Sequence, residues 1–277
     1  MNVERTTLFC WSGGGLPGLD IHVGIWQALS DLGIEATANA GTSAGAIMAA
    51  LNSNGMTAVA ARRIIGSLSD SDVRSERFAW KVRIPWISYF LENEPIRKLL
   101  EANLPAYFTD LKKPLHVFCT AESSGVSWSF SDGQLIDRIL GSMAICGVFP
   151  PVAGLTDGGT SADLPLPPGW QKFDQVYLLI AARPIDYRGK DSILTRLMFN
   201  ADLFMEGQIQ RTIADAKAIR PDVHVIRPLV RAPRGGLHFD HALIAESEIF
   251  TKMILANAVE RALRNQERRT TNKELRP

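Results

Sequence analysis

Cysteine is scarce in this chain. The three cysteines, Cys10, Cys119 and Cys146, form no CxxC pair and show no spacing typical of a metal site. A small secreted domain built on disulfides carries more cysteines, usually in an even number. The cysteine content therefore favours reduced thiols in the cytoplasm, and it predicts no metal site.

Long apolar runs are absent as well. No stretch approaches the ~20 consecutive apolar residues that a membrane-spanning helix needs. The start of the chain, residues 1–7, also lacks the basic segment and the apolar run of a signal peptide. We therefore expect a cytoplasmic protein whose contact with a membrane, if it makes one, is peripheral.

Neither sign of charge is in excess. The chain has 30 Lys and Arg residues and 29 Asp and Glu residues, for a net charge of +1. Domains that bind nucleic acid usually carry a basic excess, so we expect no nucleic-acid partner. With 46% apolar and 21% charged residues, the composition is typical of a globular protein with a sizeable core. We predict a single domain over residues 1–277.

The most informative stretch is Gly41-Thr42-Ser43-Ala44-Gly45, which fits the G-x-S-x-G pattern of a nucleophile elbow. In such a turn, a serine stands between a strand and a helix with its hydroxyl group exposed. Side chains at the two glycine positions would crowd the strand and the helix where the backbone bends. Residues 44–51 then predict a helix, whose N-terminus favours an anion beside Ser43.

A glycine run at residues 13–15 follows the first predicted strand, and together with Gly18 it formally matches the dinucleotide-binding pattern G-x-G-x-x-G. That function needs an acidic residue at the end of the second strand, and residues 38–40 supply none. One alternative is a purely structural turn. The other is an oxyanion hole, in which backbone N–H groups stabilise the intermediate formed when Ser43 attacks a carbonyl. We favour the oxyanion hole, because it also explains the serine on the next strand.

The order of the predicted elements indicates the fold class. Two strand–helix pairs within residues 1–54 predict an α/β fold, a mainly parallel central sheet with helices on both faces. The apolar run 174–182 predicts a buried central strand, and the polar tail 269–277 is expected to fray. Further strands are predicted at 114–121, 126–130 and 223–226, and further helices at 58–68, 94–103, 134–144, 194–219 and 245–268.

Three motifs in order resemble those of a known family. They are the glycine turn, the Gly-Thr-Ser-Ala-Gly elbow, and Phe149-Pro150-Pro151-Val152 shortly before Asp157-Gly158-Gly159. With them the chain resembles the patatin-like phospholipases, over residues 7–166. The resemblance implies a serine lipid acyl hydrolase, a phospholipase A-type esterase that needs no cofactor. Its substrate would be a phospholipid or another acyl-ester lipid.

The resemblance also implies roles for particular residues. The nucleophile would be Ser43 and the base Asp157, a dyad without histidine that forms an acyl-enzyme intermediate. The backbone of Gly13, Gly14 and Gly15 would form the oxyanion hole. The chain departs from the family pattern at three positions, with Pro17 for the usual Arg or Lys, Cys146 for the usual Pro, and Asp163 where Asn is common.

The chemistry of Asp157 supports the role of base. A serine hydroxyl is a weak nucleophile until a base accepts its proton. An aspartate with its ordinary pKa of about 3.9 is a poor base, but contact with the serine in a partly desolvated cleft would raise its basicity. Asp-Gly is also a common turn sequence, so the catalytic interpretation depends on the two accompanying motifs.

Two alternatives remain open. An α/β-hydrolase-type esterase would use a Ser-His-Asp triad, and His224, His238 and His241 follow Asp157 in the permitted order. That fold builds several strands before its elbow, however, whereas Ser43 follows only two. A non-catalytic lipid- or protein-binding module on the same fold is the second alternative. It would have no need of both Ser43 and Asp157.

The segment 78–91 is rich in aromatic and aliphatic residues, among them Trp80, Trp86 and Phe90. One interpretation is a cover that packs onto the core. The other is a cap over the acyl-binding cleft, with aromatic side chains that insert at a lipid surface. These three residues are therefore candidates for contact with substrate and with a membrane.

Overall fold

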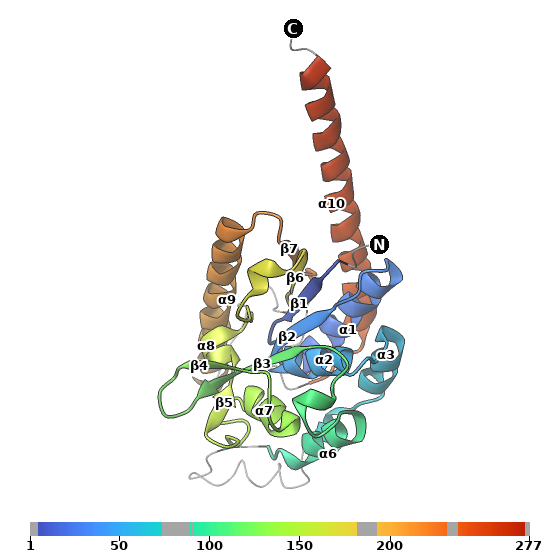
Figure 1. Cartoon of the computed structure of the whole chain (residues 1–277). Helices are drawn as coiled ribbons and strands as arrows, with labels where there is room; N and C mark the ends of the chain where they lie inside the picture. The colour runs from blue at the N-terminus through green and yellow to red at the C-terminus, as the bar shows by residue number, and fades with distance from the viewer. Residues whose placement is uncertain (1–4, 74–88, 90, 182–192, 232–237, 275–277) are drawn as a thin grey trace.

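The structure is a computed structural model that describes residues 5–73, 89, 91–181, 193–231 and 238–274. Its centre is one seven-stranded sheet with the order β4-β3-β2-β1-β6-β7, in which β5 also pairs with β3 (Figure 1). Strands β1, β2, β3, β6 and β7 are parallel, and β4 and β5 run antiparallel to β3. The strands are β1 (Thr7–Trp11), β2 (Ala38–Thr42), β3 (Leu115–Ala121), β4 (Ser127–Phe130), β5 (Leu155–Asp157), β6 (Gln175–Leu179) and β7 (His224–Ile226).

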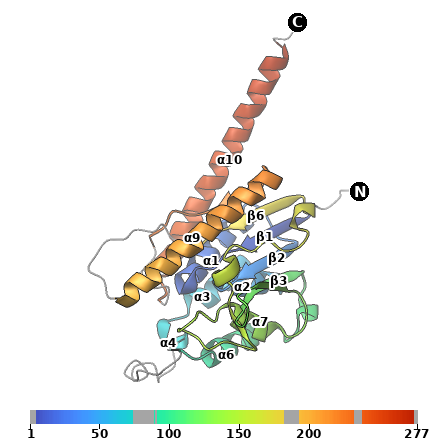
Figure 2. The same ribbon diagram turned by 90° about the vertical axis from the view of Figure 1, so that its left-hand side faces the viewer.

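Helices cover both faces of this sheet. Figure 2 shows α9 lying across one face, with α1, α2 and α3 on the other. The mainly parallel sheet with helices on both faces, predicted from the sequence, is therefore confirmed. The helices are α1 (Gly15–Asp31), α2 (Ala44–Ser53), α3 (Ala58–Gly66), α4 (Asp70–Val73), α6 (Glu94–Asn103), α7 (Leu135–Ser142), α8 (Gly159–Ala162), α9 (Ile193–Ile219) and α10 (Ala242–Glu274).

The apolar run Leu8-Phe9-Cys10-Trp11 of β1 follows from this burial on both sides. Successive side chains of a strand point to opposite faces of the sheet. Phe9 and Trp11 belong to the larger core, which includes residues of α1, α2 and α10. Leu8 and Cys10 belong to a smaller core, which includes residues of α9. A strand covered on one face only would alternate between apolar and polar residues instead.

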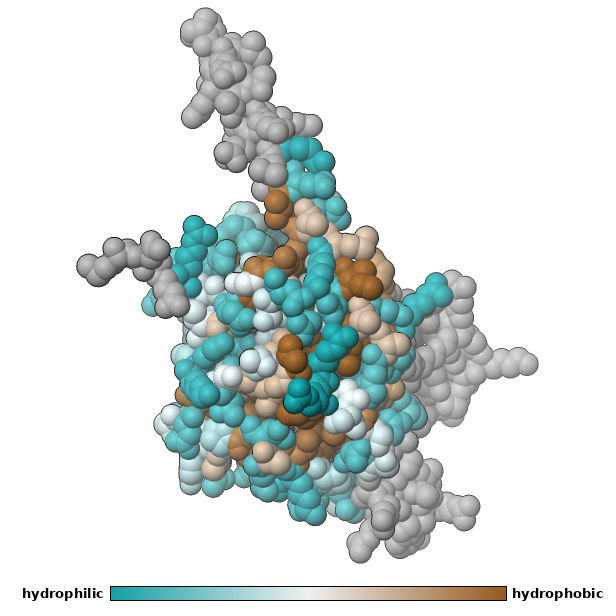
Figure 3. Space-filling model, turned by 90° about the vertical axis from the view of Figure 1, so that its right-hand side faces the viewer, coloured by the Kyte–Doolittle hydropathy of each residue, from teal (hydrophilic) through white to brown (hydrophobic). Residues whose placement is uncertain are grey.

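The last helix, α10, packs on α1 at its base and then projects away from the body (Figure 1). The two helices approach closely at Gly24, where a Cβ atom would lie 2.8 Å from the Cβ of Ser247. Lys252 pairs with Asp31 at 2.6 Å and with Glu248 at 2.8 Å. Figure 3 shows this side, with hydrophilic and hydrophobic side chains intermixed around the base of the helix. The helix continues to Glu274, past the point where we expected a frayed tail.

A buried polar network ties the first two strands to α2. The indole N–H of Trp11 donates to the side-chain oxygen of Asn39 at 2.9 Å. The amide nitrogen of Asn39 donates to Asn52 at 2.9 Å and to the hydroxyl of Ser53 at 3.0 Å. The network fixes the strand and the helix that flank the turn at Ser43.

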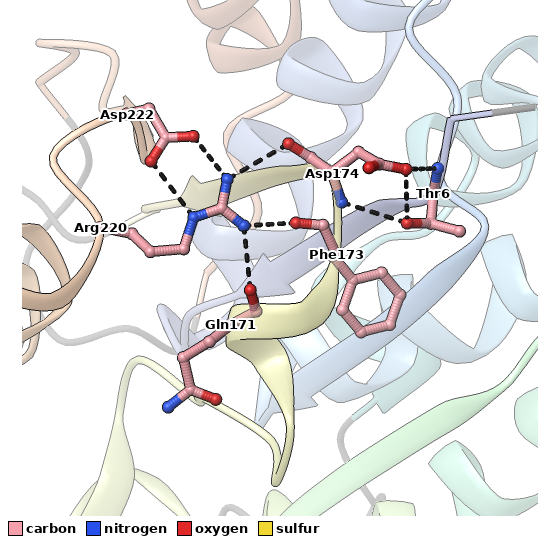
Figure 4. Close-up of polar contacts among 6 residues, drawn as sticks. All are labelled: Thr6, Gln171, Phe173, Asp174, Arg220 and Asp222. Carbon is pink, nitrogen blue, oxygen red and sulfur yellow. Dashed lines mark hydrogen bonds and ion pairs between the residues drawn. The ribbon is translucent and has the colours of Figure 1, made fainter.

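Arg220, directly after α9, holds that helix against the sheet (Figure 4). Its guanidinium group, only 18% exposed, pairs with Asp222. The same group donates to the backbone carbonyls of Gln171, Phe173 and Asp174, which lead into β6. A cation at this position also opposes the negative end of the helix dipole.

We predict that Arg220→Met lowers the free energy of unfolding by about 2 kcal/mol, because it removes several charge-assisted hydrogen bonds to the carbonyls that lead into β6. Chemical denaturation followed by circular dichroism measures this change. Lys217→Met is the matched control, since Lys217 is an exposed cation on the same helix. Equal stability of the two variants would show that the carbonyl contacts contribute nothing.

Candidate active site

Ser43 occupies the sharp turn between β2 and α2. It adopts φ 54° and ψ −124°, a conformation that is strained for a residue other than glycine. A Cβ atom at Gly45 would collide with the carbonyl oxygens of Trp11 and Ser12, and one at Gly41 would collide with the carbonyl of Gly45. The glycines of the elbow are therefore required by close packing, as the sequence pattern predicts.

Ser142, at the end of α7, holds this turn in place. Its hydroxyl accepts the backbone N–H of Ser43 at 2.8 Å and donates to the carbonyl of Phe118 at 2.6 Å. Its own carbonyl accepts the N–H of Gly158 at 3.1 Å. Ser142 is fully buried, and it bonds to the backbone of Ser43 and of Gly158, the residue that follows Asp157. Sequence analysis did not identify it, because nothing in its local sequence distinguishes it from other helical serines.

The sheet register brings Asp157 to Ser43. β2 ends at Thr42, which pairs with Phe118 of β3, and the next residue of β3, Cys119, pairs with Asp157 of β5. The other edge of β3 is occupied by β4. β5 therefore continues on the edge that β2 leaves, and Asp157 lies next to the turn that carries Ser43.

The strand register places the side chain of Ser43 near the carboxyl group of Asp157. Both residues are buried, with exposures of 4% and 7%. Burial raises the pKa of the Asp157 carboxyl to about 6, while the Gly159 N–H and the nearby Ser43 side chain act in the opposite direction. The Gly159 N–H donates to Oδ1 of Asp157 at 3.0 Å. This carboxyl is thus a stronger base than an exposed aspartate.

The glycine run lies on the other side of Ser43. The N–H of Gly13 donates to the carbonyl of Asp163 at 3.0 Å, so it is already engaged within the protein. Gly15 begins α1 and Gly14 is its N-cap. The first N–H groups of a helix have no partner within the helix, so the donors suited to an anion here are those of Gly14 and Gly15. The oxyanion hole at Gly13, Gly14 and Gly15 stays a prediction, and the N–H of Gly13 has a partner within the protein.

A second carboxyl group, that of Asp163, lies beside Gly13. Asp163 is 4% exposed. Burial, together with the nearby carboxylates of Asp157, Glu206 and Asp202, raises its pKa to about 8. Sequence analysis noted Asp163 only as a departure from the family pattern. A second buried acid could not be inferred from that departure alone.

An apolar pocket opens beside Ser43. It is formed by α1, α2 and the segment that follows α7. Its lining is almost entirely aliphatic or aromatic, so the surface next to the serine favours an apolar group. The apolar lining residues are Leu16, Leu19, Ala44, Ile47, Met143, Ile145 and Phe149.

The histidines of the alternative triad have partners other than Ser43. None of the three is hydrogen-bonded to Asp157 among the contacts of the described residues. His224 stacks on Tyr177 with ring centroids 4.5 Å apart, His238 bonds to Asp70 at 2.6 Å, and His241 bonds to Asp20 at 2.8 Å.

The other predicted features concern partners and metal ions. Trp80, Trp86 and Phe90 lie outside the residues that the structure describes. Within the described ranges, no cluster of three or more His, Cys, Asp or Glu side chains is suited to a metal ion. None of the described helices is both long enough and apolar enough to cross a membrane.

Comparison with known proteins decides the family. The model of the family described as "Patatin-like phospholipase" matches residues 9–170, more than half of the chain. The chain belongs to the patatin-like phospholipase family. The matched region contains the glycine turn, Ser43 and Asp157, and it agrees with the range expected from the sequence motifs.

One curated relative is the lysophospholipase NTE1 of Mycosarcoma maydis, which is 29% identical over 166 residues. That match covers 56% of this patatin-like chain but only 8% of the length of NTE1. Among solved structures, VipD from Legionella pneumophila has a TM-score of 0.53 at 13% identity, covering 92% of this chain and 67% of VipD. ExoU of Pseudomonas aeruginosa, solved with SpcU, has a TM-score of 0.44 at 15% identity, covering 93% and 52% of the two chains.

The glycine turn of this patatin-like site leads to a test. A Cβ atom at Gly14 would lie 2.9 Å from the Cα of Gly18 and 3.1 Å from the Cβ of Ala181. We expect Gly14→Val to displace the neighbouring N–H groups and to lower ester turnover by on the order of 10²–10³-fold, the cost of losing one oxyanion donor.

Turnover of a soluble short-chain ester measures this effect, and circular dichroism monitors folding. Gly66→Val is the control, since a Cβ atom at Gly66 meets only a side-chain methyl group at 3.9 Å. Full turnover by a folded Gly14→Val protein would place the oxyanion donors elsewhere.

Proposed function

We propose that this protein is a serine lipid acyl hydrolase in which Ser43 attacks the carbonyl of an acyl ester and Asp157 accepts the serine proton. The strand register that brings the buried Asp157 carboxyl next to Ser43 carries this proposal. A base must lie near the proton that it removes, and its pKa must suit the working pH. The position of Asp157 and its raised pKa support both requirements.

The neighbouring groups suit the steps that follow. Attack by Ser43 places negative charge on the former carbonyl oxygen, and the N–H groups of Gly14 and Gly15 can stabilise it. The N-terminus of α2, directly after Ser43, contributes a partial positive charge. The tetrahedral intermediate collapses as the alcohol leaves with the proton from Asp157. Water, activated by the same carboxylate, then hydrolyses the acyl-Ser43 ester and regenerates the enzyme.

The apolar pocket supports a lipid substrate. One aliphatic chain of a lysophospholipid, phospholipid or related acyl ester would enter between α1 and α2, so that its ester bond lies at Ser43. The family assignment and the similarity to a lysophospholipase favour the same class of substrate. A peripheral contact with the lipid surface would deliver the substrate, and we keep Trp80, Trp86 and Phe90 as candidates for it.

The alternatives have less support. A triad would need a histidine between Ser43 and a carboxylate, whereas His238 and His241 are engaged with Asp70 and Asp20. A non-catalytic binding module would gain nothing from a strained serine against a buried base, because both features cost stability.

We expect Ser43→Ala and Asp157→Asn each to lower the turnover of a lysophospholipid by several orders of magnitude. The double variant should be little worse than either single one, since the two groups act as one unit. Release of free fatty acid, measured by mass spectrometry, quantifies turnover. His238→Ala should retain wild-type turnover, because that side chain bonds to a remote aspartate.

Two results would contradict this proposal. Additive losses in the double variant would show that Ser43 and Asp157 act in separate steps. A loss in folded His238→Ala or His241→Ala as large as in Asp157→Asn would replace the dyad with a triad.

The acid limb of the pH profile is a further expected outcome. Asp157 accepts a proton only when it is ionised, and burial raises its pKa to about 6. The kcat/KM for a soluble ester should therefore rise with pH through about 6 and level off above it. A profile with its acid limb near pH 4, the range of an ordinary aspartate, would exclude a buried carboxylate as the base.

A further inference from the structure

Asp163 lies close to three parts of the site, namely the glycine turn, Ser43 and Asp157. The sequence analysis did not predict it as a site residue. Its backbone carbonyl accepts the N–H of Gly13 at 3.0 Å. Its Oδ1 atom lies so close to Gly13 that a Cβ atom there would collide with it, and the same Cβ would lie 3.6 Å from the Cβ of Ser43. The backbone next to it is anchored as well, because the hydroxyl of Thr42 donates to the carbonyl of Ala162 at 2.8 Å.

The same oxygen also lies near the base. A Cβ atom at Gly159 would be 3.0 Å from Oδ1 of Asp163 and 3.4 Å from Oδ2 of Asp157. The Asp163 carboxyl group thus fills the space between the glycine turn, the nucleophile and the base. It is buried there, with 4% of the residue exposed.

We propose that Asp163 is a positioning residue whose neutral carboxyl group fixes the glycine turn beside Ser43, and that ionisation of this group switches the enzyme off. This inference rests on the proposed hydrolysis at Ser43. It extends that proposal by assigning a second carboxyl group to the site, with a role opposite to that of Asp157: Asp157 must be ionised, and Asp163 must not be.

The charged groups around Asp163 are mostly acidic. Asp157 faces it from β5, and Glu206 and Asp202 face it from α9. Glu206 is itself paired with Arg227 at 2.7 Å, so that cation is directed to another carboxylate. Burial, strengthened by these like charges, raises the pKa of Asp163 to about 8. The group is therefore mainly protonated at neutral pH.

A negative charge on Asp163 would oppose the reaction in two ways. It would stand beside Gly13 and Ser43, where the oxyanion of the intermediate forms, and destabilise that charge by repulsion. It would also repel the ionised Asp157 across the short space near Gly159 and displace either group from its position. A neutral carboxyl group of the same shape causes neither effect.

The test compares kcat/KM for a soluble ester from pH 5 to pH 10. Wild-type activity should fall above about pH 8. Asp163→Asn, which has the same shape but cannot ionise, should retain turnover at pH 7 and lose this alkaline limb. Asp163→Ala should lose turnover at every pH, on the order of 10²-fold if the turn moves by about 1 Å.

A second substitution tests the electrostatic cause. Asp202→Asn removes a charge that raises the pKa of Asp163, so it should move the alkaline limb to lower pH. Asp20→Asn is the matched control: Asp20 is another fully buried aspartate, but it bonds to His241, directly before α10. This control should leave the alkaline limb in place.

Three results would overturn the inference. An alkaline limb that persists in Asp163→Asn would belong to another group. An inactive but folded Asp163→Asn protein would mean that the ionised form is needed. A limb that Asp202→Asn does not move would exclude the acidic surroundings as the cause. None of these results affects the proposed hydrolysis, which the comparison of wild type with Ser43→Ala tests separately.

A stability measurement tests the neutral carboxyl group without catalysis. The folded protein holds the Asp163 proton more tightly than the unfolded chain does, because burial raises the pKa from 3.8. Wild-type stability should therefore fall as pH rises from about 4 to about 8, and Asp163→Asn should lack this loss. The Tm of the variant minus that of wild type should grow between pH 5 and pH 9. A constant difference would show that Asp163 is already ionised at pH 5, and the inference would be wrong.

Discussion

The candidate site depends on a change of pairing partner along one edge of β3, from β2 to β5. Where β2 turns away at Thr42, β5 takes its place, and the register then sets Asp157 beside Ser43. Parallel strands deliver their carboxyl ends to one edge of a sheet, which is why a strand-to-helix turn there can expose a nucleophile. The antiparallel β5 brings the base to the same edge from the opposite direction. Ser142 holds the turns at Ser43 and Gly158 in place, because its hydroxyl accepts the N–H of Ser43 and its carbonyl accepts the N–H of Gly158.

Burial at this edge accounts for the electrostatics of the site. Removing Asp157 from water raises its basicity toward neutral pH, and the same surroundings keep the second carboxyl, Asp163, protonated. Glu206 would add a further negative charge to that of Asp157, but its bidentate pair with Arg227 offsets most of it. Buried carboxyl groups lower the stability of the fold, and proteins retain such destabilising features mainly at functional sites. The hydrogen bonds of Arg220 and the packing of α10 on α1 contribute to the folding stability that offsets this cost.

Much of this architecture could be predicted because its signals are local. Short apolar runs identified the buried strands, and the glycine pattern identified the elbow at Ser43. The family resemblance pointed to Asp157. Ser142 and Asp163 could not be predicted, since each acts through contacts with residues about a hundred or more positions away. The engagement of the Gly13 N–H with Asp163 likewise depends on tertiary packing. Domain organisation and the interfacial roles of Trp80, Trp86 and Phe90 stay predictions.

The central claim is that Ser43 is a nucleophile activated by Asp157, and covalent labelling tests it most directly. The protein would be treated with an alkyl fluorophosphonate and analysed by intact mass and peptide mass spectrometry. The account predicts one added phosphonyl group, located on Ser43, and greatly slowed labelling in Asp157→Asn. Wild-type protein that remains unlabelled, or an Asp157→Asn variant that reacts at the wild-type rate, would contradict it.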